Sequence, residues 1–144
     1  MTSPLFETVM RFFDLDDWPV QVVTPGTLIQ THFAGDGGLF QCWMRITPKA
    51  GAIVFSVEAP QHVPPAKRTL AVELTHLLNW NSPIGCFEMN LADGQILYRQ
   101  GLIVGQGALT YGLLKPVIYG AVMTMDIQWP EIADVLGLSG GLAH

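Results

Sequence analysis

Charged side chains are scarce in this sequence. Only 13% of the 144 residues are charged, against about 25% in an ordinary soluble domain, and 49% are hydrophobic. A chain of this length forms one domain with a sizeable core, but so few charges do not cover its surface. We therefore expect a partner to cover part of it, first of all a second copy in a two-fold homodimer. A compact monomer with a surface rich in threonine, glutamine and asparagine is the alternative.

Basic residues and long apolar runs are also lacking. The chain has seven Lys and Arg in total, a net charge of −5 at pH 7 and no basic stripe. Nucleic-acid binding needs clustered cations that neutralise phosphates, so we expect no nucleic-acid partner. The most apolar stretch, residues 101–125, contains Gln106, Lys115 and Pro116. Because a membrane helix needs roughly 20 nearly uninterrupted apolar residues, we expect no membrane span.

There are two cysteines, Cys42 and Cys86, in separate predicted strands. The first residues show no charged segment followed by an apolar run, so we expect no secretion signal. This combination predicts reduced, buried thiols in a cytoplasmic protein. A nucleophilic thiolate needs an electropositive setting, and this chain has few cations to provide one.

Motifs that bind cofactors or metals are missing. Residues 105–107 lack the third glycine of a dinucleotide-binding loop, and the four histidines have no metal-ligand spacing to another histidine or a cysteine. Asp14, Asp16 and Asp17 lie close together but without the ligand spacing of a Ca²⁺ loop. We therefore predict no catalytic residue, no cofactor, no metal site and no enzymatic activity.

Periodicity and turn residues predict an α+β domain over residues 1–136. Ser3 and Pro4 begin a helix that ends near residues 14–17, and short turns join the strands that follow into an antiparallel meander. The apolar face of a second helix is assigned to Leu70, Leu74, Leu77 and Leu78. The expected later elements are strands at 20–23, 28–33, 39–47 and 52–59, a helix at about 65–80, a β-hairpin, a flexible join at 101–107, helices at 108–125 and 130–136 separated by residues 126–129, and a flexible tail at 137–144.

The hairpin is predicted from Asp93-Gly94, a common two-residue turn. This turn pairs Leu91 with Ile96, Met89 with Tyr98, and Glu88 with Arg99. The face assigned to the core holds Phe87, Met89, Leu91, Ile96 and Tyr98. Glu88 and Arg99 then face each other on the other side, as a surface ion pair that sets the register and contributes up to ~1 kcal/mol.

The order of several residues resembles the YbjN-like family, labelled bacterial sensory transduction regulators. The matching positions are Trp18, Pro64 or Pro65, Arg68, Asn79, Asn81, Gly85, Phe87-Glu88, Asp93-Gly94 and Tyr98-Arg99. The resemblance covers roughly residues 5–136, and the chain departs from the pattern in its low charge and its glycine-rich segment at 101–107. It implies a type III secretion chaperone-like fold, with helices on one face of a strongly twisted antiparallel sheet. It also implies a dimeric, non-enzymatic protein that binds other proteins, and it transfers no catalytic residue.

An antiparallel sheet with one face under helices leaves the other face open. If the sheet is continuous, the hairpin and the fourth strand together supply this candidate partner-binding face: Val54, Ser56, Glu58, Cys86, Glu88, Leu97 and Arg99. Such a mixed polar and apolar face is suited to an extended peptide or a second subunit, and an exposed edge strand can accept an added strand.

Three functions remain open at this point. The first is a chaperone-like or regulatory adaptor that acts as a homodimer and binds another protein. The second is a small-molecule-sensing or enzymatic domain with a site between sheet and helices, and the third is a structural subunit of a larger complex. Because enzyme sites bring titratable groups together and the predicted core faces are nearly all apolar, the sequence favours the adaptor.

Overall fold

The computed structural model describes residues 2–138, which form a six-stranded antiparallel sheet and three α-helices. The strand order is β1-β2-β3-β4-β6-β5. The elements are α1 (Pro4–Leu15), β1 (Val20–Thr24), β2 (Leu28–Gly35), β3 (Gly38–Thr47), β4 (Ala52–Glu58), α2 (Arg68–Trp80), β5 (Cys86–Met89), β6 (Ile96–Ile103) and α3 (Tyr111–Val135), with single 3₁₀ turns at Pro48–Ala50 and Pro65–Lys67. The structure confirms the α+β class and the meander.

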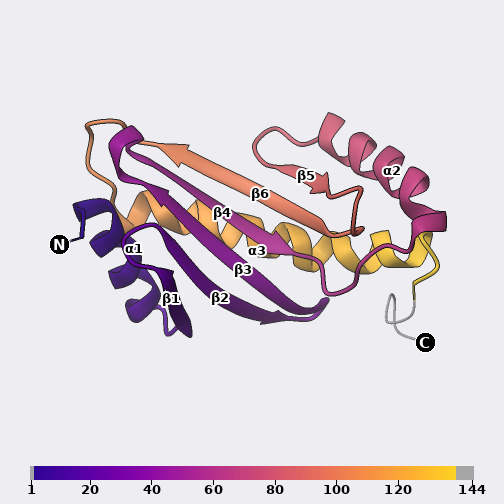
Figure 1. Ribbon diagram of the computed structural model, residues 1–144, viewed down its shortest axis with the longest axis horizontal. Coiled ribbons are helices and arrows are strands. Elements are labelled where there is room, and N and C mark those ends of the chain that lie inside the picture. The colour runs from indigo at the N-terminus through magenta and orange to yellow at the C-terminus, as the bar shows by residue number, and fades with distance from the viewer. Residues whose placement is uncertain (1, 139–144) are drawn as a thin grey trace.

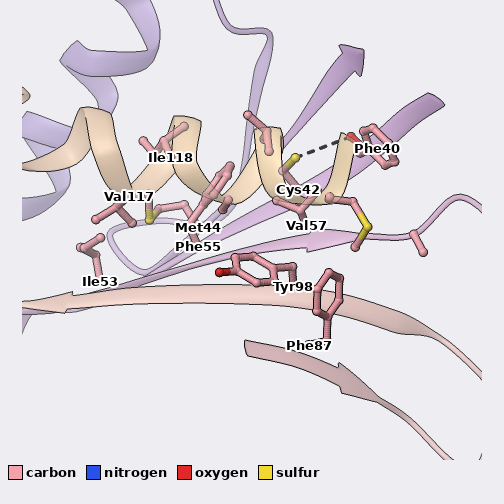
Figure 2. Packing of buried hydrophobic residues seen from close by; sticks show 14 of the residues in the cluster. Phe40, Cys42, Met44, Ile53, Phe55, Val57, Phe87, Tyr98, Val117 and Ile118 are labelled. Atoms are coloured by element: carbon pink, nitrogen blue, oxygen red, sulfur yellow. Dashed lines mark hydrogen bonds between the residues drawn. The ribbon is translucent and has the colours of Figure 1, made fainter. Parts of the chain in front are cut away.

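The core lies between one face of the sheet and the helices α1 and α3. Figure 1 shows α3 running behind the sheet along its length, α1 near β1, and α2 beside β5 at the other end. Ile53, Phe55 and Val57 alternate along β4 and are fully buried, as their spacing predicts. Figure 2 shows Phe55 near Val117 of α3, with the other buried side chains in the same layer.

The β5–β6 hairpin has a different register from the predicted one. Phe87 pairs with Tyr98 and Met89 with Ile96, so the connection spans residues 90–95 instead of a two-residue turn. The Asn90 side chain accepts a hydrogen bond from the backbone N–H of Ala92, and the Asp93 side chain accepts one from that of Gln95, each at 2.9 Å. These hydrogen bonds stabilise the longer loop.

A register shift by two positions leaves every strand residue on its predicted face. The hairpin residues assigned to the core therefore still point toward it, except Leu91, which lies in the loop and is 65% exposed. Arg68 holds this loop against α2, because its guanidinium donates to the carbonyl oxygens of Val63, Leu91 and Ala92.

Of two predicted interruptions of regular structure, one is shorter than expected and the other is absent. Residues 101–103 continue β6 and pair with β4 up to Ala52, so this part of the predicted flexible join is a strand. The region predicted as two helices is the single helix α3, which contains both Pro116 and Pro130. Proline removes one intrahelical hydrogen bond, so a continuous helix must satisfy or solvate the freed carbonyl groups.

Asp126, whose carbonyl is freed by Pro130, contacts the turn between β2 and β3. The backbone N–H of Gly37 donates to the Asp126 carboxylate at 2.5 Å. A Cβ atom at Gly35 would collide with this carboxylate, and one at Gly37 would collide with the Asp126 carbonyl oxygen. The glycines of the turn therefore allow close contact with α3 at the point where the helix was predicted to break.

The inward face of α2 also differs from the prediction. Ala71 and Thr75 are its buried residues, while Leu74 and Leu78 pack at the margin of the core. Leu70 and Leu77, which were assigned to the core, are 42% and 61% exposed. Small side chains face inward because α2 lies close against β5, where the Asn79 side chain makes two hydrogen bonds to the backbone of Phe87.

The C-terminal end of α3 is closed by a hydrogen-bonded cap. Gly137 has a positive φ of 67°, and the Leu138 N–H donates to the Ala133 carbonyl at 2.9 Å. These are the first residues of the predicted flexible tail, and residues 139–144 lie outside the described part of the chain. Between residues 2 and 138, no helix is both long and apolar enough to cross a membrane.

We predict that Gly37→Ala lowers the free energy of unfolding by about 1–3 kcal/mol, because the added methyl group forces the turn away from α3. Urea unfolding followed by circular dichroism measures the change. Asp36→Ala, in the same exposed turn, is the control and is expected to change stability by less than about 0.5 kcal/mol. Equal stabilities of the two variants would contradict the proposed contact.

Candidate functional site

The structure brings the predicted partner-binding residues together on one face of a continuous sheet. Arg99 of β6 pairs with Ser56 of β4 on one side and with Cys86 of β5 on the other. Leu97 in the next row pairs in the same way with Glu58 and Glu88. Val54 lies opposite Gly101, further along the same face. Because their neighbours in each strand point into the core, these residues lie on the face opposite α1 and α3, which we call the open face.

The open face carries one ion pair, between Glu88 and Arg99, with 3.1 Å between the charged atoms. The pair was predicted to lie directly across the hairpin, but in the observed register it is diagonal, because Glu88 is opposite Leu97. Both side chains are close to half exposed. Solvent screening therefore limits the contribution of this pair to about 0–1 kcal/mol.

Three residues of the open face were missed by the sequence analysis. Leu28, Trp43 and Arg45 line a hollow of about 270 Å³ together with four of the predicted residues: Val54, Ser56, Leu97 and Arg99. The signal was present in β3, where Phe40, Cys42, Met44 and Ile46 are buried and Trp43 falls between them on the other face. An aromatic residue on the outward side of a half-covered strand marks a candidate contact site.

A second apolar surface lies on α2 and on the loop after it. Its large side chains are well exposed, with Trp80 at 82%, Ile84 at 76% and Leu77 at 61%. A hollow of about 400 Å³ lies among Val72, Glu73, His76 and Leu77. We call this the α2 surface. The assignment of Leu70 and Leu77 to the core was wrong, because both lie on this exposed side of the helix.

The two edges of the sheet differ in their accessibility. At β5 the Asn79 side chain accepts a hydrogen bond from the Phe87 N–H at 2.7 Å and donates one to the Phe87 carbonyl at 2.9 Å. It therefore occupies the outer edge of this strand. At the other edge, every residue of β1 is exposed, including Val20 and Val22. Only the irregular register between Val22 and Thr24 interrupts this edge.

The two cysteines lie in different surroundings. Burial, and to a smaller extent the nearby Glu58 carboxylate, raise the pKa of the Cys42 thiol to about 12. Its Sγ lies 3.6 Å from the Phe40 carbonyl, inside the core. Cys86 is half-buried on the open face. Within residues 2–138, no group of three or more His, Cys, Asp or Glu side chains is arranged to hold a metal ion.

Of the acidic residues near the end of α1, Asp16 connects two helices. The Asp16 carboxylate accepts hydrogen bonds from the hydroxyl groups of Tyr111 and Tyr119, both on α3. The Trp18 ring nitrogen donates to Tyr119 at 3.2 Å. These bonds connect the end of α1 to α3, and the bond to Asp16 is the main cause of the raised pKa of Tyr111.

The model of one protein family matches residues 6–126 of the chain, and its description is "YbjN: Putative bacterial sensory transduction regulator". A comparison with curated proteins gives no match. The family match covers most of the helices and the whole sheet, and it confirms the resemblance found in the sequence.

Three solved structures have a similar fold. The crystal structure of YbjN from E. coli, described as "a putative transcription regulator", has a TM-score of 0.65 and 16% identity, covering 92% of this chain and 93% of that one. The HopA1-SchA chaperone-effector complex has a TM-score of 0.55 and 12% identity, covering 89% and 95%. The ExsC-ExsE complex has a TM-score of 0.51 and 10% identity, covering 86% and 92%. The fold is therefore the predicted type III secretion chaperone-like fold.

We predict that the folded protein exposes one thiol to Ellman's reagent at pH 8, namely Cys86, and two thiols after unfolding in urea. The high pKa and burial of Cys42 keep it protonated and inaccessible. Cys86→Ser is the control and leaves no rapidly reacting thiol in the folded protein. Rapid modification of this variant under native conditions would show that Cys42 is accessible.

Proposed function

The chain belongs to the YbjN family, and from this premise we propose that it is a non-enzymatic protein-binding module, a chaperone-like or regulatory adaptor of the cytoplasm. The observation that carries the proposal is the open face, a continuous surface with an apolar centre and charged groups of both signs around it. The similar fold of SchA in a chaperone-effector complex supports the same role. Two free thiols fit a reducing compartment.

The chemistry of the open face favours an extended polypeptide as its partner. Trp43, Leu28 and Leu97 offer apolar contact area at the hollow, and Arg45 and Arg99 offer hydrogen-bond donors beside it. Aromatic and arginine side chains contribute most strongly to protein interfaces. A mixed surface of this kind binds alternating apolar and acidic side chains better than it binds a single small solute.

The exposed edge of β1 provides a second way to hold an extended segment. A partner strand there would pair with backbone groups of Val20 and Val22 that face away from β2. Asn79 blocks the equivalent approach at β5. We therefore propose that a partner strand adds to the sheet beside β1.

We further propose that the protein forms a homodimer through the α2 surface. Trp80, Leu77 and Ile84 are large apolar residues with well-exposed side chains, and a second copy of α2 would cover them. This interface would account for part of the shortage of surface charge. It leaves the open face free for another protein, because α2 lies beside β5 and not over the sheet (Figure 1).

We predict that Leu77→Arg disrupts this dimer. Placing a charge in the buried centre of an interface is expected to raise the dimer dissociation constant about 30-fold or more, which corresponds to about 2 kcal/mol. Because Leu77 is exposed in the single chain, the variant is expected to fold. Sedimentation velocity at micromolar concentration measures the fraction of dimer.

Ile103→Arg is the matched control, since Ile103 is 76% exposed at the far end of β6. We expect this variant to dimerise like the unchanged protein. A monomeric unchanged protein would rule out the homodimer, and equal dimer fractions for both variants would place the interface away from α2.

We predict that Trp43→Ala abolishes retention of the protein partner when the tagged protein is purified from its native cells and bound proteins are identified by mass spectrometry. The substitution removes the largest apolar contact of the open face while leaving the opposite core unchanged. Met123→Ala, on the outer side of α3, is the control and is expected to retain the partner. The open face is not the binding surface if the unchanged protein and both variants retain the same partners. The same conclusion follows if none of the three retains any partner.

A further inference from the structure

A cleft at the margin of the core lies apart from the open face and adjoins the α2 surface, with which it shares Ile84. It has a volume of about 420 Å³, which lies within the range of roughly 300–1,000 Å³ for small-molecule sites. Its walls come from the end of α2 and the loop after it, from β5 and β6, and from the middle of α3. The cleft lies at the edge of the layer between sheet and helices, where the sequence left open a small-molecule site.

The lining contains no Asp, Glu, Lys, Arg or His side chain. Phe87, Tyr98 and Pro116 form apolar parts of the wall, and uncharged amides such as Gln100 and Gln128 lie among them. A charged ligand would lose its hydration here without gaining a counter-charge, and this loss is costly. The electrostatics of the cleft therefore favour an uncharged ligand.

Tyr98 provides a hydrogen-bonding group that faces the cleft. Its side chain is only 4% exposed, and its hydroxyl has no hydrogen-bond partner within residues 2–138. No fully buried side-chain oxygen or nitrogen in that part of the chain lacks a partner, so this hydroxyl must reach open space. Figure 2 shows the hydroxyl pointing away from Phe87, and a Cβ atom at Gly85 would collide with it.

Gly120 keeps one wall of the cleft open. It lies in the middle of α3, where glycine is less favourable than alanine by about 0.5–1 kcal/mol. No rigid group occupies the place of its missing side chain, because the nearest atoms belong to the flexible end of Gln100, at 3.3 Å. An alanine here would require only a small movement of the end of Gln100, whereas a larger side chain would extend into the cleft.

From these observations we propose that the cleft binds a small, uncharged, largely apolar molecule that forms hydrogen bonds with the Tyr98 hydroxyl and the neighbouring amides. The binding requires no catalysis and no second protein, so the proposal is independent of the protein-binding role. It gives the protein a means to respond to a small solute.

The test uses the fluorescent probe N-phenyl-1-naphthylamine, which is uncharged and apolar and carries one N–H group. We expect saturable binding of one probe molecule per chain. Gly120→Leu fills the cleft from α3 and is expected to weaken binding about tenfold or more. Gly112→Leu makes the same change on an open part of the same helix, where the nearest atom to a new Cβ is 3.9 Å away, and is expected to bind normally.

Gly120→Ala adds only a methyl group, and alanine favours the helix more than glycine does. We therefore expect this variant to fold even if Gly120→Leu does not. We expect it to weaken binding while raising the urea midpoint. The anionic analogue 8-anilino-1-naphthalenesulfonate tests the charge preference and is expected to bind at least about tenfold more weakly.

Three results would overturn the proposal. The first is no saturable binding, or equal binding by the Gly120 and Gly112 variants, which would place the probe on another apolar surface such as that of α2. The second is equally tight binding of the anionic analogue at the Gly120-dependent site. The third is loss of probe binding when the chain dimerises, which would show that a second copy fills the cleft. Sedimentation velocity without probe tests the dimer separately.

Discussion

The packing of α3 across one face of the sheet is the contact on which the rest of the structure depends. Nine side chains of this helix are buried, and they meet the inward residues of β3, β4 and β6. Because each strand alternates its side chains, covering one face directs every second residue to the other. The open face, with its hollow around Trp43, is therefore a direct consequence of placing both α1 and α3 on the same side.

The few polar residues mainly position backbone segments. Arg68 binds three carbonyl groups around the β5–β6 loop, and Asn79 binds both backbone groups of Phe87. Asp16 and Asp126 connect α3 to the end of α1 and to the β2–β3 turn. Two of the positions that carry the family resemblance, Arg68 and Asn79, therefore stabilise the arrangement of α2 and the hairpin.

The open face is separate from the α2 surface and the cleft, which adjoin each other. The open face is the side of the sheet opposite α3, and the α2 surface lies beyond β5. The cleft lies where α2, β6 and α3 meet. Self-association through α2 would leave the open face accessible to a different protein. The loop after α2 borders both the dimer surface and the cleft, since Ile84 is exposed and also lines the cleft.

The sequence by itself determined the α+β class, the meander and the faces of β4 and the two hairpin strands, Leu91 excepted, because alternation and turn residues act over a few positions. It also placed Glu88 and Arg99 on one face, since a shift by two preserves that face. Only the tertiary structure decided that α3 is continuous through Pro130, that α2 turns Ala71 inward and Leu77 outward, and that an uncharged cleft opens beside Gly120. Each of these features depends on contacts between segments distant in the chain, such as Gly37 with Asp126, and local spacing does not encode such contacts.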